Sequence, residues 1–468
     1  IQKSFRSVGT LPLHRVFRST SNPMQDPMSS RRSGKSPASV HAALALLTAA
    51  YVLSYVDRTI IALMVGPIRA DLGLTDTQFS LLGGLAFAVF YSTLGVPFGW
   101  WADRGNRPRI VALGVFFWSV MTMLCGFARS FTGLFLMRVG VGVGEAALSP
   151  SAYSLIAETY PPDRVGRALS IYGTGIYLGV GLSFVLGGVL VDRLSALPPI
   201  EIGFLGEFAG WQQVFLLVGL PGLLLAPLAL FVLREPRLER LSDTVGSGAD
   251  GRADPSRPNI FAWLGQNRLF LIAHFLGFSA LSLAFNGYLA WMAEFLLRTF
   301  AVGKSESGFA IGIIVLILGV GGMLAGGFVS DWLRQRGDLK GALTAACGGA
   351  IAMTPFAAIA PLMPSATASL LAFAPIMALS AFCFGPAVIA LQLATPIDLR
   401  ARTSALFLLV VNLAGIGLGG TVVAAISDFS LGADGARIGE ALALAGGASA
   451  LIGVPLLFLA RHKMPTYE

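Results

Sequence analysis

The chain has 468 residues, of which 55% are apolar and only 12% are charged, with a net charge of +8 and a mean hydropathy of +0.73. Soluble proteins carry about 25% charged residues, so this composition excludes a soluble multidomain enzyme, and its apolar content excludes a disordered chain. It predicts an all-α membrane protein, because a spanning helix needs about 20 apolar residues and the length allows about a dozen.

Cysteine usage and charge indicate no bound cofactor. The three cysteines lie in apolar stretches, without the spacing of a zinc site, and their number is odd for a disulfide framework. We therefore expect neither a metal nor another cofactor. In a soluble protein the positive charge would favour nucleic acid as a partner. In a membrane protein, basic residues in the loops instead set its orientation, so no nucleic-acid partner is expected.

The first region, residues 1–39, is predicted to be a disordered basic tail. Residues 1–37 contain seven Lys and Arg but a single acid, Asp26, and they are rich in Ser. An organelle transit peptide has the same composition. That alternative stays open beside a cytoplasmic tail or an upstream extension.

Twelve apolar segments follow the tail. They cover approximately residues 40–67, 78–101, 109–128, 131–159, 168–191, 211–233, 268–297, 308–330, 341–362, 367–393, 403–426 and 438–460. The longest internal polar stretch divides them six and six. We predict a six-helix bundle at 40–233, a cytoplasmic linker at 234–260 and a second six-helix bundle at 261–463.

The distribution of basic residues predicts the orientation. If the N-terminus is cytoplasmic, 25 Lys and Arg lie on the inner side and six on the outer side, with Arg58 and Arg138 inside spans. Cytoplasmic loops carry an excess of Lys and Arg. Both termini are therefore expected inside the cell.

The two halves share landmarks in the same order. The second and eighth spans end in related strings that begin with Gly and contain Asp and Arg, at Gly99, Asp103 and Arg104 and at Gly327, Asp331 and Arg334. Pro162-Asp-Arg before the fifth span likewise has a counterpart at Pro396-Ile-Asp before the eleventh. Parallel repeats of this kind are associated with alternating-access transporters.

These features resemble the major facilitator superfamily. Its loop signature is matched at Gly99, Asp103, Arg104, Arg107 and Arg109, with Asn106 in place of the usual glycine. The resemblance implies two six-helix bundles around a central cavity. It also implies an inner latch that closes in the outward-open state, for which the candidates are Gly99, Asp103, Arg104, Arg107, Asp331 and Arg334. The alternative is that these charges only orient the helices.

Further strings resemble the Spinster branch of that superfamily. They are Asp-Arg-x-Asn-Arg at 103–107, Tyr-Val-Asp-Arg at 55–58, Phe-Phe-Trp-Ser at 116–119 and Arg-Val-Gly-Val-Gly-Val-Gly-Glu-Ala at 138–146. The resemblance implies lysolipids, sphingoid phosphates or related amphiphiles as substrates, coupled to protons.

Charged residues within the first-half spans are the main site candidates, since a charge at bilayer depth is costly and marks a pathway or proton relay. Glu145 and Arg138 lie two helical turns apart on one face of the fourth span, and Asp57 falls between them in depth. We predict Asp57 and Glu145 as proton-coupling residues and Arg138 as the anion-binding cation. The alternative is a fixed pair between Arg138 and Asp57. Arg58, rotated by about 100° from Asp57, is a weaker substrate-binding candidate, expected to face another helix or the outer interface.

The corresponding wall of the second half lacks these charges. Counting back from the shared landmarks places Asn286 opposite Asp57 in the repeat. Asn286, Tyr288 and Trp291 are the substrate-binding candidates there, with Phe285 and Phe384 nearby. One charged and one apolar wall favour an amphiphile over a sugar, although aromatic residues in spans also serve packing alone.

The sequence thus predicts a monomeric secondary transporter of anionic, lipid-like molecules. A polyspecific drug efflux protein of the same fold is the alternative. An ATP-driven pump is rejected because Gly34-Lys-Ser and Gly303-Lys-Ser lack the upstream glycine of a phosphate loop. The 28 Arg and five Lys indicate a GC-rich genome, which favours a bacterial inner membrane; in an animal cell the resemblance implies a lysosomal or plasma membrane.

Overall fold

The computed structural model of the chain describes residues 37–161, 164–201, 203, 206–236, 260–396, 399–430 and 437–465. Within these residues lie twelve helices that are long and apolar enough to cross a membrane, the first at Val40–Leu63 and the last at Ile438–Lys463. Each overlaps one predicted segment, so the predicted all-α membrane fold is confirmed. Nearly all of the tail 1–39 and most of the linker 234–260 lie outside the described residues.

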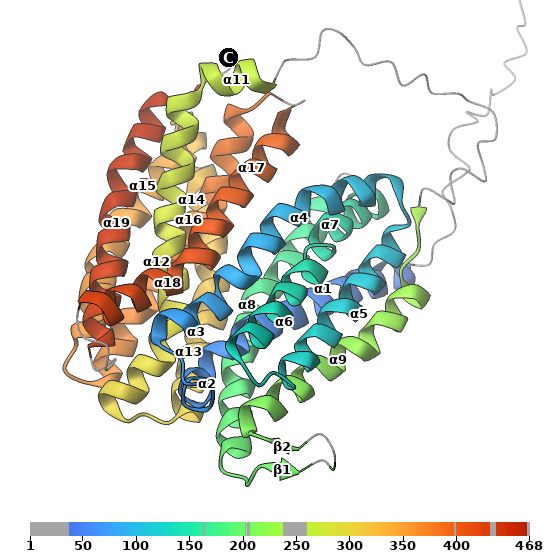
Figure 1. Cartoon of the computed structure of the whole chain (residues 1–468). Coiled ribbons are helices and arrows are strands. Elements are labelled where there is room, and N and C mark those ends of the chain that lie inside the picture. The colour runs from blue at the N-terminus through green and yellow to red at the C-terminus, as the bar shows by residue number, and fades with distance from the viewer. Residues whose placement is uncertain are drawn as a thin grey trace, which may run out of the picture. The chain divides into compact units, whose positions relative to one another are not determined.

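The first six spans are drawn from blue to green in Figure 1. Their elements are α1 (Pro37–Thr59), the 3-10 helix η1 (Ile60–Leu63), α2 (Val65–Leu72), α3 (Asp76–Gly83), α4 (Leu85–Arg104), α5 (Arg107–Cys125), α6 (Phe131–Glu145), α7 (Leu148–Thr159), α8 (Val165–Ser195) and α9 (Gly210–Val232). Between α8 and α9 the strands β1 (Ile200–Glu201) and β2 (Glu207–Phe208) form a short antiparallel pair that the sequence analysis does not predict.

The last six spans run from yellow to red. Their elements are α11 (Ile260–Gln266), α12 (Arg268–Phe300), α13 (Lys304–Ile314), the π-helix η3 (Val315–Gly319), α14 (Val320–Gln335), α15 (Gly341–Ile359), the 3-10 helix η4 (Ala360–Leu362), α16 (Ala366–Ala394), α17 (Arg400–Asn412), the π-helix η6 (Leu413–Leu418), α18 (Gly419–Ala425), the π-helix η7 (Ile426–Ser430) and α19 (Ile438–Lys463). The π turns interrupt the eighth and eleventh spans. Such turns are frequent at functional sites.

Local sequence signals set several of the helix ends. The Thr75 hydroxyl accepts from the Gln78 N–H while the Gln78 side chain accepts from the Thr75 N–H, which forms a capping box at the start of α3. The side chains of Asn106 and Ser130 cap α5 and α6, each accepting a bond from the backbone N–H three residues on. Gly73 ends α2 with a φ of 65°, in the left-handed region that favours glycine.

Glycine spacing in α6 lets the fourth span approach its neighbours. A Cβ atom on Gly142 would lie 2.6 Å from the Phe87 carbonyl oxygen of α4, and one on Gly144 would lie 2.7 Å from the Trp118 nitrogen of α5. Any larger side chain would therefore force the helices apart. This close packing brings the end of α6, with Glu145, against the centre of the first bundle.

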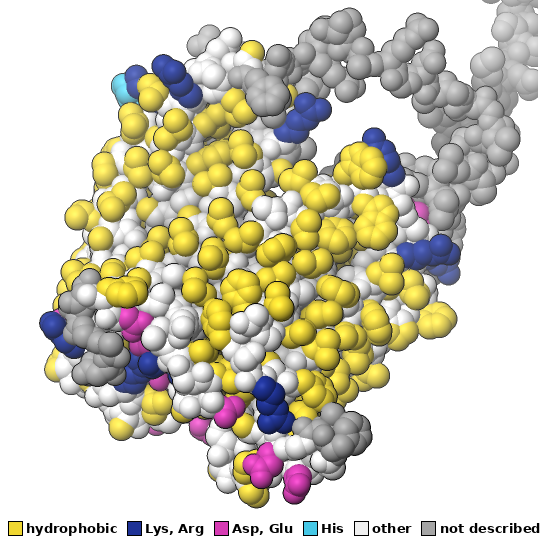
Figure 2. Space-filling view, in the orientation of Figure 1, with side chains coloured by type: hydrophobic (Ala, Val, Ile, Leu, Met, Phe, Trp, Pro, Cys, Tyr) yellow, Lys and Arg dark blue, Asp and Glu magenta, His cyan; other side chains and the backbone are white. Residues whose placement is uncertain are grey.

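Side-chain types on the surface match a protein surrounded by lipid. Figure 2 shows hydrophobic side chains covering the lateral face, whereas Lys, Arg, Asp and Glu gather at the two ends of the helices. Large apolar side chains stay exposed there, among them Phe231 at 83% and Phe328 at 73%. In water such a surface would aggregate, but in a bilayer it is the expected exterior.

The two halves are joined by polar contacts at the end expected to be outer. Asp192 of α8 accepts from the Ser305 N–H at the start of α13 (2.6 Å), and Asp428 of η7 accepts from the Thr77 N–H of α3 (2.8 Å). The two bonds are equivalent in the repeat. The first joins the fifth span to the eighth, and the second joins the eleventh span to the second. Arg298 of α12 adds a bidentate contact to the carboxylate at the start of α3. These contacts close the end of the helices that is expected to be outer.

Candidate functional site

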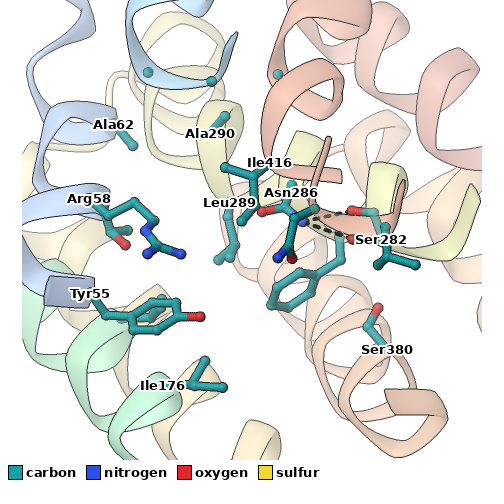
Figure 3. A pocket seen from close by; sticks show the side chains of 18 of the residues that line it. Tyr55, Arg58, Ala62, Ile176, Ser282, Asn286, Leu289, Ala290, Ser380 and Ile416 are labelled. Atoms are coloured by element: carbon teal, nitrogen blue, oxygen red, sulfur yellow. Dashed lines mark hydrogen bonds between the residues drawn. The ribbon is translucent and has the colours of Figure 1, made fainter. Parts of the chain in front are cut away.

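A central pocket lies between the two halves. It has a cavity volume of about 210 Å³ and is lined by residues of α1, η1, α3 and α8 from the first half and of α12, α16, α17 and η6 from the second. Figure 3 shows Tyr55 and Arg58 on one side, facing Asn286, Ser282 and Ser380 on the other. Much of the remaining lining is aromatic: Phe79, Phe278, Phe285, Trp291, Phe384 and Phe407. The pocket therefore combines one guanidinium with an apolar wall.

Arg58 is the cation that lines this pocket. Its Cζ lies 4.3 Å from the Phe87 ring centroid, 4.5 Å from that of Tyr55 and 4.6 Å from that of Tyr91, so three rings hold the guanidinium in place. Its Nη2 donates to Glu145 at 2.7 Å. Its Nε and Nη1 are buried without a hydrogen-bond partner among the described residues. Two of its donor nitrogens are therefore unpaired within the described protein.

Glu145 lies behind Arg58 and does not line the pocket. It is the last residue of α6 and 1% exposed, and its Oε2 accepts from Arg58 and from the Ser54 hydroxyl of α1. Its Oε1 has no hydrogen-bond partner in the described structure. The pair is electrically neutral while Glu145 is ionised. Protonation of Glu145 would leave the pocket with an uncompensated positive charge at Arg58.

Asp57 and Arg138 are buried deeper, at 2% and 0% exposure. Asp57 Oδ2 accepts from the Thr122 hydroxyl at 3.1 Å, while its Oδ1 has no partner in the described part. Arg138 donates to the backbone carbonyl oxygens of Asp57 (3.2 Å), Leu82 (3.4 Å) and Arg58 (3.5 Å). The alternative of a fixed pair between the two side chains is therefore not supported, because the described contacts of the guanidinium go to backbone carbonyls.

This geometry also corrects the expected orientation of Arg58 on α1. The sequence predicts that Arg58 faces another helix or the outer interface. The Asp57 carboxylate points toward Thr122 of α5. Arg58 is the next residue, about 100° further round the helix, and it faces the pocket. Of these two arginines, Arg58 lines the pocket and Arg138 does not.

Two of the three candidates in the second half line the pocket. Asn286 donates to the Ser282 carbonyl (2.9 Å) and hydroxyl (3.3 Å), and Trp291 donates to the Gly420 carbonyl at 2.9 Å. Tyr288 does not line it and is fully buried, with its hydroxyl donating to the Ala357 carbonyl of α15. Two residues rotate a helix by about 200°, so Asn286 and Tyr288 face opposite sides of α12.

The cytoplasmic candidates divide into an internal cluster and exposed charges. Arg107 is fully buried and pairs with Glu158 at 2.8 Å and with Glu235, which ties the ends of α5, α7 and α9 within the first half. The expectation that it belongs to a latch between the halves does not fit this position. Neither glutamate is named in the sequence analysis, and Glu235 lies two residues beyond an apolar run.

The remaining latch candidates have no described contact across the halves. The Arg104 guanidinium stacks on Trp100 at 4.2 Å, and Gly99 lies close to Pro150 of α7. Asp331 and Arg334 are exposed. The side chain of Asp103 lies outside the described part of the structure. A latch role for these residues stays a prediction.

A charged cluster also stabilises the expected cytoplasmic end of the second half. Partial burial of Asp338 acts to raise its pKa, but hydrogen bonds from the Thr344 hydroxyl (2.5 Å) and the Lys340 N–H (2.9 Å) and the nearby Arg461 charge lower it more. The net result is a pKa below the usual value. The cluster connects the loop before α15 to the end of α19.

Comparison with known proteins gives consistent results. Residues 47–420 match the model of the Major Facilitator Superfamily. An "MFS-type efflux pump" of Mycolicibacterium smegmatis is 29% identical over 91% of this chain and 94% of its own length, and a "probable L-galactonate transporter" of Escherichia coli is 28% identical over 73% and 72%. A crystal structure of a bacterial homolog of the human lysosomal transporter Spinster, inward-facing and unoccupied, matches with a TM-score of 0.74 and 28% identity over 92% of this chain and 98% of that one.

Proposed function

The chain belongs to the major facilitator superfamily and is an integral membrane transporter related to Spinster, and we propose that it moves an anionic amphiphile together with protons by alternating access. The observation that carries the proposal is Arg58. It is a guanidinium with two unpartnered donors, facing an otherwise largely apolar and aromatic pocket. Such a pocket suits a molecule with an anionic head and an apolar body, as in a lysolipid.

Charge balance supplies the proton coupling. With Glu145 ionised, the buried Arg58–Glu145 pair is neutral, so an anion entering the pocket gives the site a net negative charge. Buried net charge is costly, and protonation of Glu145 restores neutrality. Anion and proton therefore bind in the same state and move in the same direction. Asp57, with its unpartnered Oδ1, is the second candidate proton acceptor.

Alternating access follows from which end of the helices is closed. The repeat-related bonds of Asp192 and Asp428 tie the halves at the outer end, which corresponds to an inward-facing state. For the substrate to reach the other side, these bonds must break while the cytoplasmic ends meet. Asp103 and Asp331 stay the candidates for that inner contact. We place the protein in a bacterial inner membrane, in keeping with its Arg-rich composition.

Drug efflux is the second candidate function. It is favoured by the aromatic lining and by the likeness to an efflux pump of 29% identity. A cationic drug would be attracted by ionised Glu145 and repelled by Arg58, so the drug and the proton would compete and move in opposite directions. The direction of proton movement therefore separates the two functions.

The test is uptake into proteoliposomes with an imposed pH gradient. Lysophosphatidylglycerol, which carries an anionic phosphodiester, should accumulate on the alkaline side, and replacement of Arg58 by Gln should abolish accumulation. The control is Arg437→Gln, which removes an exposed arginine that pairs with Glu440 outside the pocket. Accumulation of a cationic dye on the acidic side that persists in Arg58→Gln would instead establish drug efflux.

A further inference from the structure

The wall of the pocket opposite Arg58 contains a cluster of polar side chains, which we name the amide subsite. It consists of Ser282 and Asn286 of α12 and Asn412 at the end of α17, and all three line the pocket. Figure 3 shows Ser282 and Asn286 facing the side that carries Arg58. Neutral polar groups on an otherwise apolar wall need a partner from the cavity if they are not bonded within the protein.

The hydrogen-bonding capacity of the amide subsite is largely unused. The Asn286 amide nitrogen donates to Ser282, but its Oδ1 accepts no described bond. Asn412 makes no hydrogen bond within the described residues, although its side chain is only half-exposed. One amide carbonyl and one complete amide are therefore available, which together can both accept and donate.

The backbone is shaped to assemble this subsite. The π-helix η6 begins directly after Asn412, and its Gly415 packs against Ser282 and Asn286. A Cβ atom on Gly415 would collide with the Ser282 hydroxyl and lie 3.0 Å from Nδ2 of Asn286. Only glycine allows α12 and the eleventh span to approach so closely, and this contact places the two asparagines on adjoining helices at one wall.

We propose that the amide subsite recognises hydroxyl groups on the headgroup of the substrate while Arg58 holds its anion. A hydroxyl both donates and accepts, which matches an amide, whereas a second anion would find no cation on this wall among the described residues. The substrate class is thereby narrowed to anions that carry neighbouring hydroxyls, such as a glycerol or polyol headgroup. This inference rests on the proposed function, because it assumes that the anion sits on Arg58.

The same headgroup chemistry occurs with or without an acyl chain. The apolar lining of the pocket favours the form with a chain. A free polyhydroxy carboxylate such as D-gluconate would satisfy Arg58 and the amide subsite but leave the aromatic wall empty. The experiment must therefore separate the hydroxyl contribution from the chain contribution.

The test compares the binding of two lysolipids that differ only in hydroxyls. Lysophosphatidylglycerol and lysophosphatidylethanol share the acyl chain and the anionic phosphodiester, and only the first has headgroup hydroxyls. Binding to the purified full-length transporter should be about tenfold tighter for lysophosphatidylglycerol, because each hydroxyl–amide bond contributes a few-fold. Asn412→Ala should reduce this ratio to nearly one. The matched control is Asn267→Ala, at the start of α12 outside the pocket, which should keep the ratio.

Each result has a defined meaning. Equal binding of the two lysolipids by the wild type overturns the amide subsite and leaves the proposed function standing. A ratio that survives Asn412→Ala also overturns it, since the discrimination then arises elsewhere. If D-gluconate binds in an Asn412-dependent manner and neither lysolipid binds, the amide subsite is supported and the amphiphile in the proposed function is refuted.

Discussion

Replacement of Glu145 by Gln should convert a pH-dependent anion site into a pH-independent one. In the wild type the carboxylate accepts from Arg58 Nη2 at 2.7 Å, and an anion on the free side of the guanidinium would lie roughly 6 Å from it. With an effective dielectric constant of about 20, that repulsion is about 3 kcal/mol, or about 100-fold in affinity. The variant removes this repulsion at every pH.

The assay is equilibrium binding of lysophosphatidylglycerol at pH 6 and pH 8. Wild-type affinity should fall as the pH rises, because the anion binds together with a proton on Glu145. The Glu145→Gln variant should bind tightly at both values, with its largest gain, up to about 100-fold, at the higher pH. Glu158→Gln, which removes a carboxylate from Arg107, is the matched control and should keep the wild-type pH dependence. An unchanged pH dependence in Glu145→Gln would refute the assignment.

Three further predictions address the surrounding structure. Arg138→Ala should lower the free energy of unfolding by about 3 kcal/mol or more, because it leaves three buried carbonyls without their donor. Denaturation in detergent measures this change, and unaltered stability would show that water replaces the guanidinium. Asp192→Asn combined with Asp428→Asn should raise the outward-open fraction in spin-label distance measurements, since both bonds hold the outer end shut, and an unchanged distribution would count against them as gates. The lowered pKa of Asp338 stabilises the folded protein at pH values above the unfolded pKa of 3.8, and this stabilisation is lost as the pH falls through the folded pKa. Asp338→Asn should therefore flatten the loss of stability below about pH 4. A stability curve that stays parallel to that of the wild type would argue otherwise.

Hydropathy predicts the spans of this protein well because the bilayer leaves the backbone few choices. Helices must satisfy their own hydrogen bonds in lipid, so all twelve predicted segments recur as spans. The depth of a charge within a span follows from the same count of residues. The short β1–β2 pair and the π turns escape prediction, since they depend on local contacts that hydropathy does not register.

The facing direction of each side chain is harder to predict than its depth. A helical period gives the angle between Asp57 and Arg58 but does not say which of the two points toward the cavity. That choice depends on the packing of α1 against α5, where the Thr122 hydroxyl donates to the Asp57 carboxylate. The same ambiguity placed Tyr288 in the pocket, although α12 turns it toward Ala357.

Partners from distant helices are the part of the site that sequence patterns cannot supply. Ser54 and Thr122 are ordinary hydroxyl residues within apolar runs, and nothing in their spacing marks them as partners of carboxylates. Asn412 escapes prediction for a similar reason, because the repeat comparison seeks the counterparts of charged residues only. A search for every amide or hydroxyl within the spans would have included all three residues.

The central claim is that an anion and a proton enter together through Arg58 and Glu145, and substrate-driven proton movement tests it most directly. Proteoliposomes with a pH-sensitive dye trapped inside would receive lysophosphatidylglycerol from albumin, without an imposed gradient. The account predicts that the lumen acidifies as the lipid enters, and that Glu145→Gln exchanges lipid without acidification. Lipid entry with no change in lumen pH in the wild type, or acidification that persists in Glu145→Gln, would contradict it.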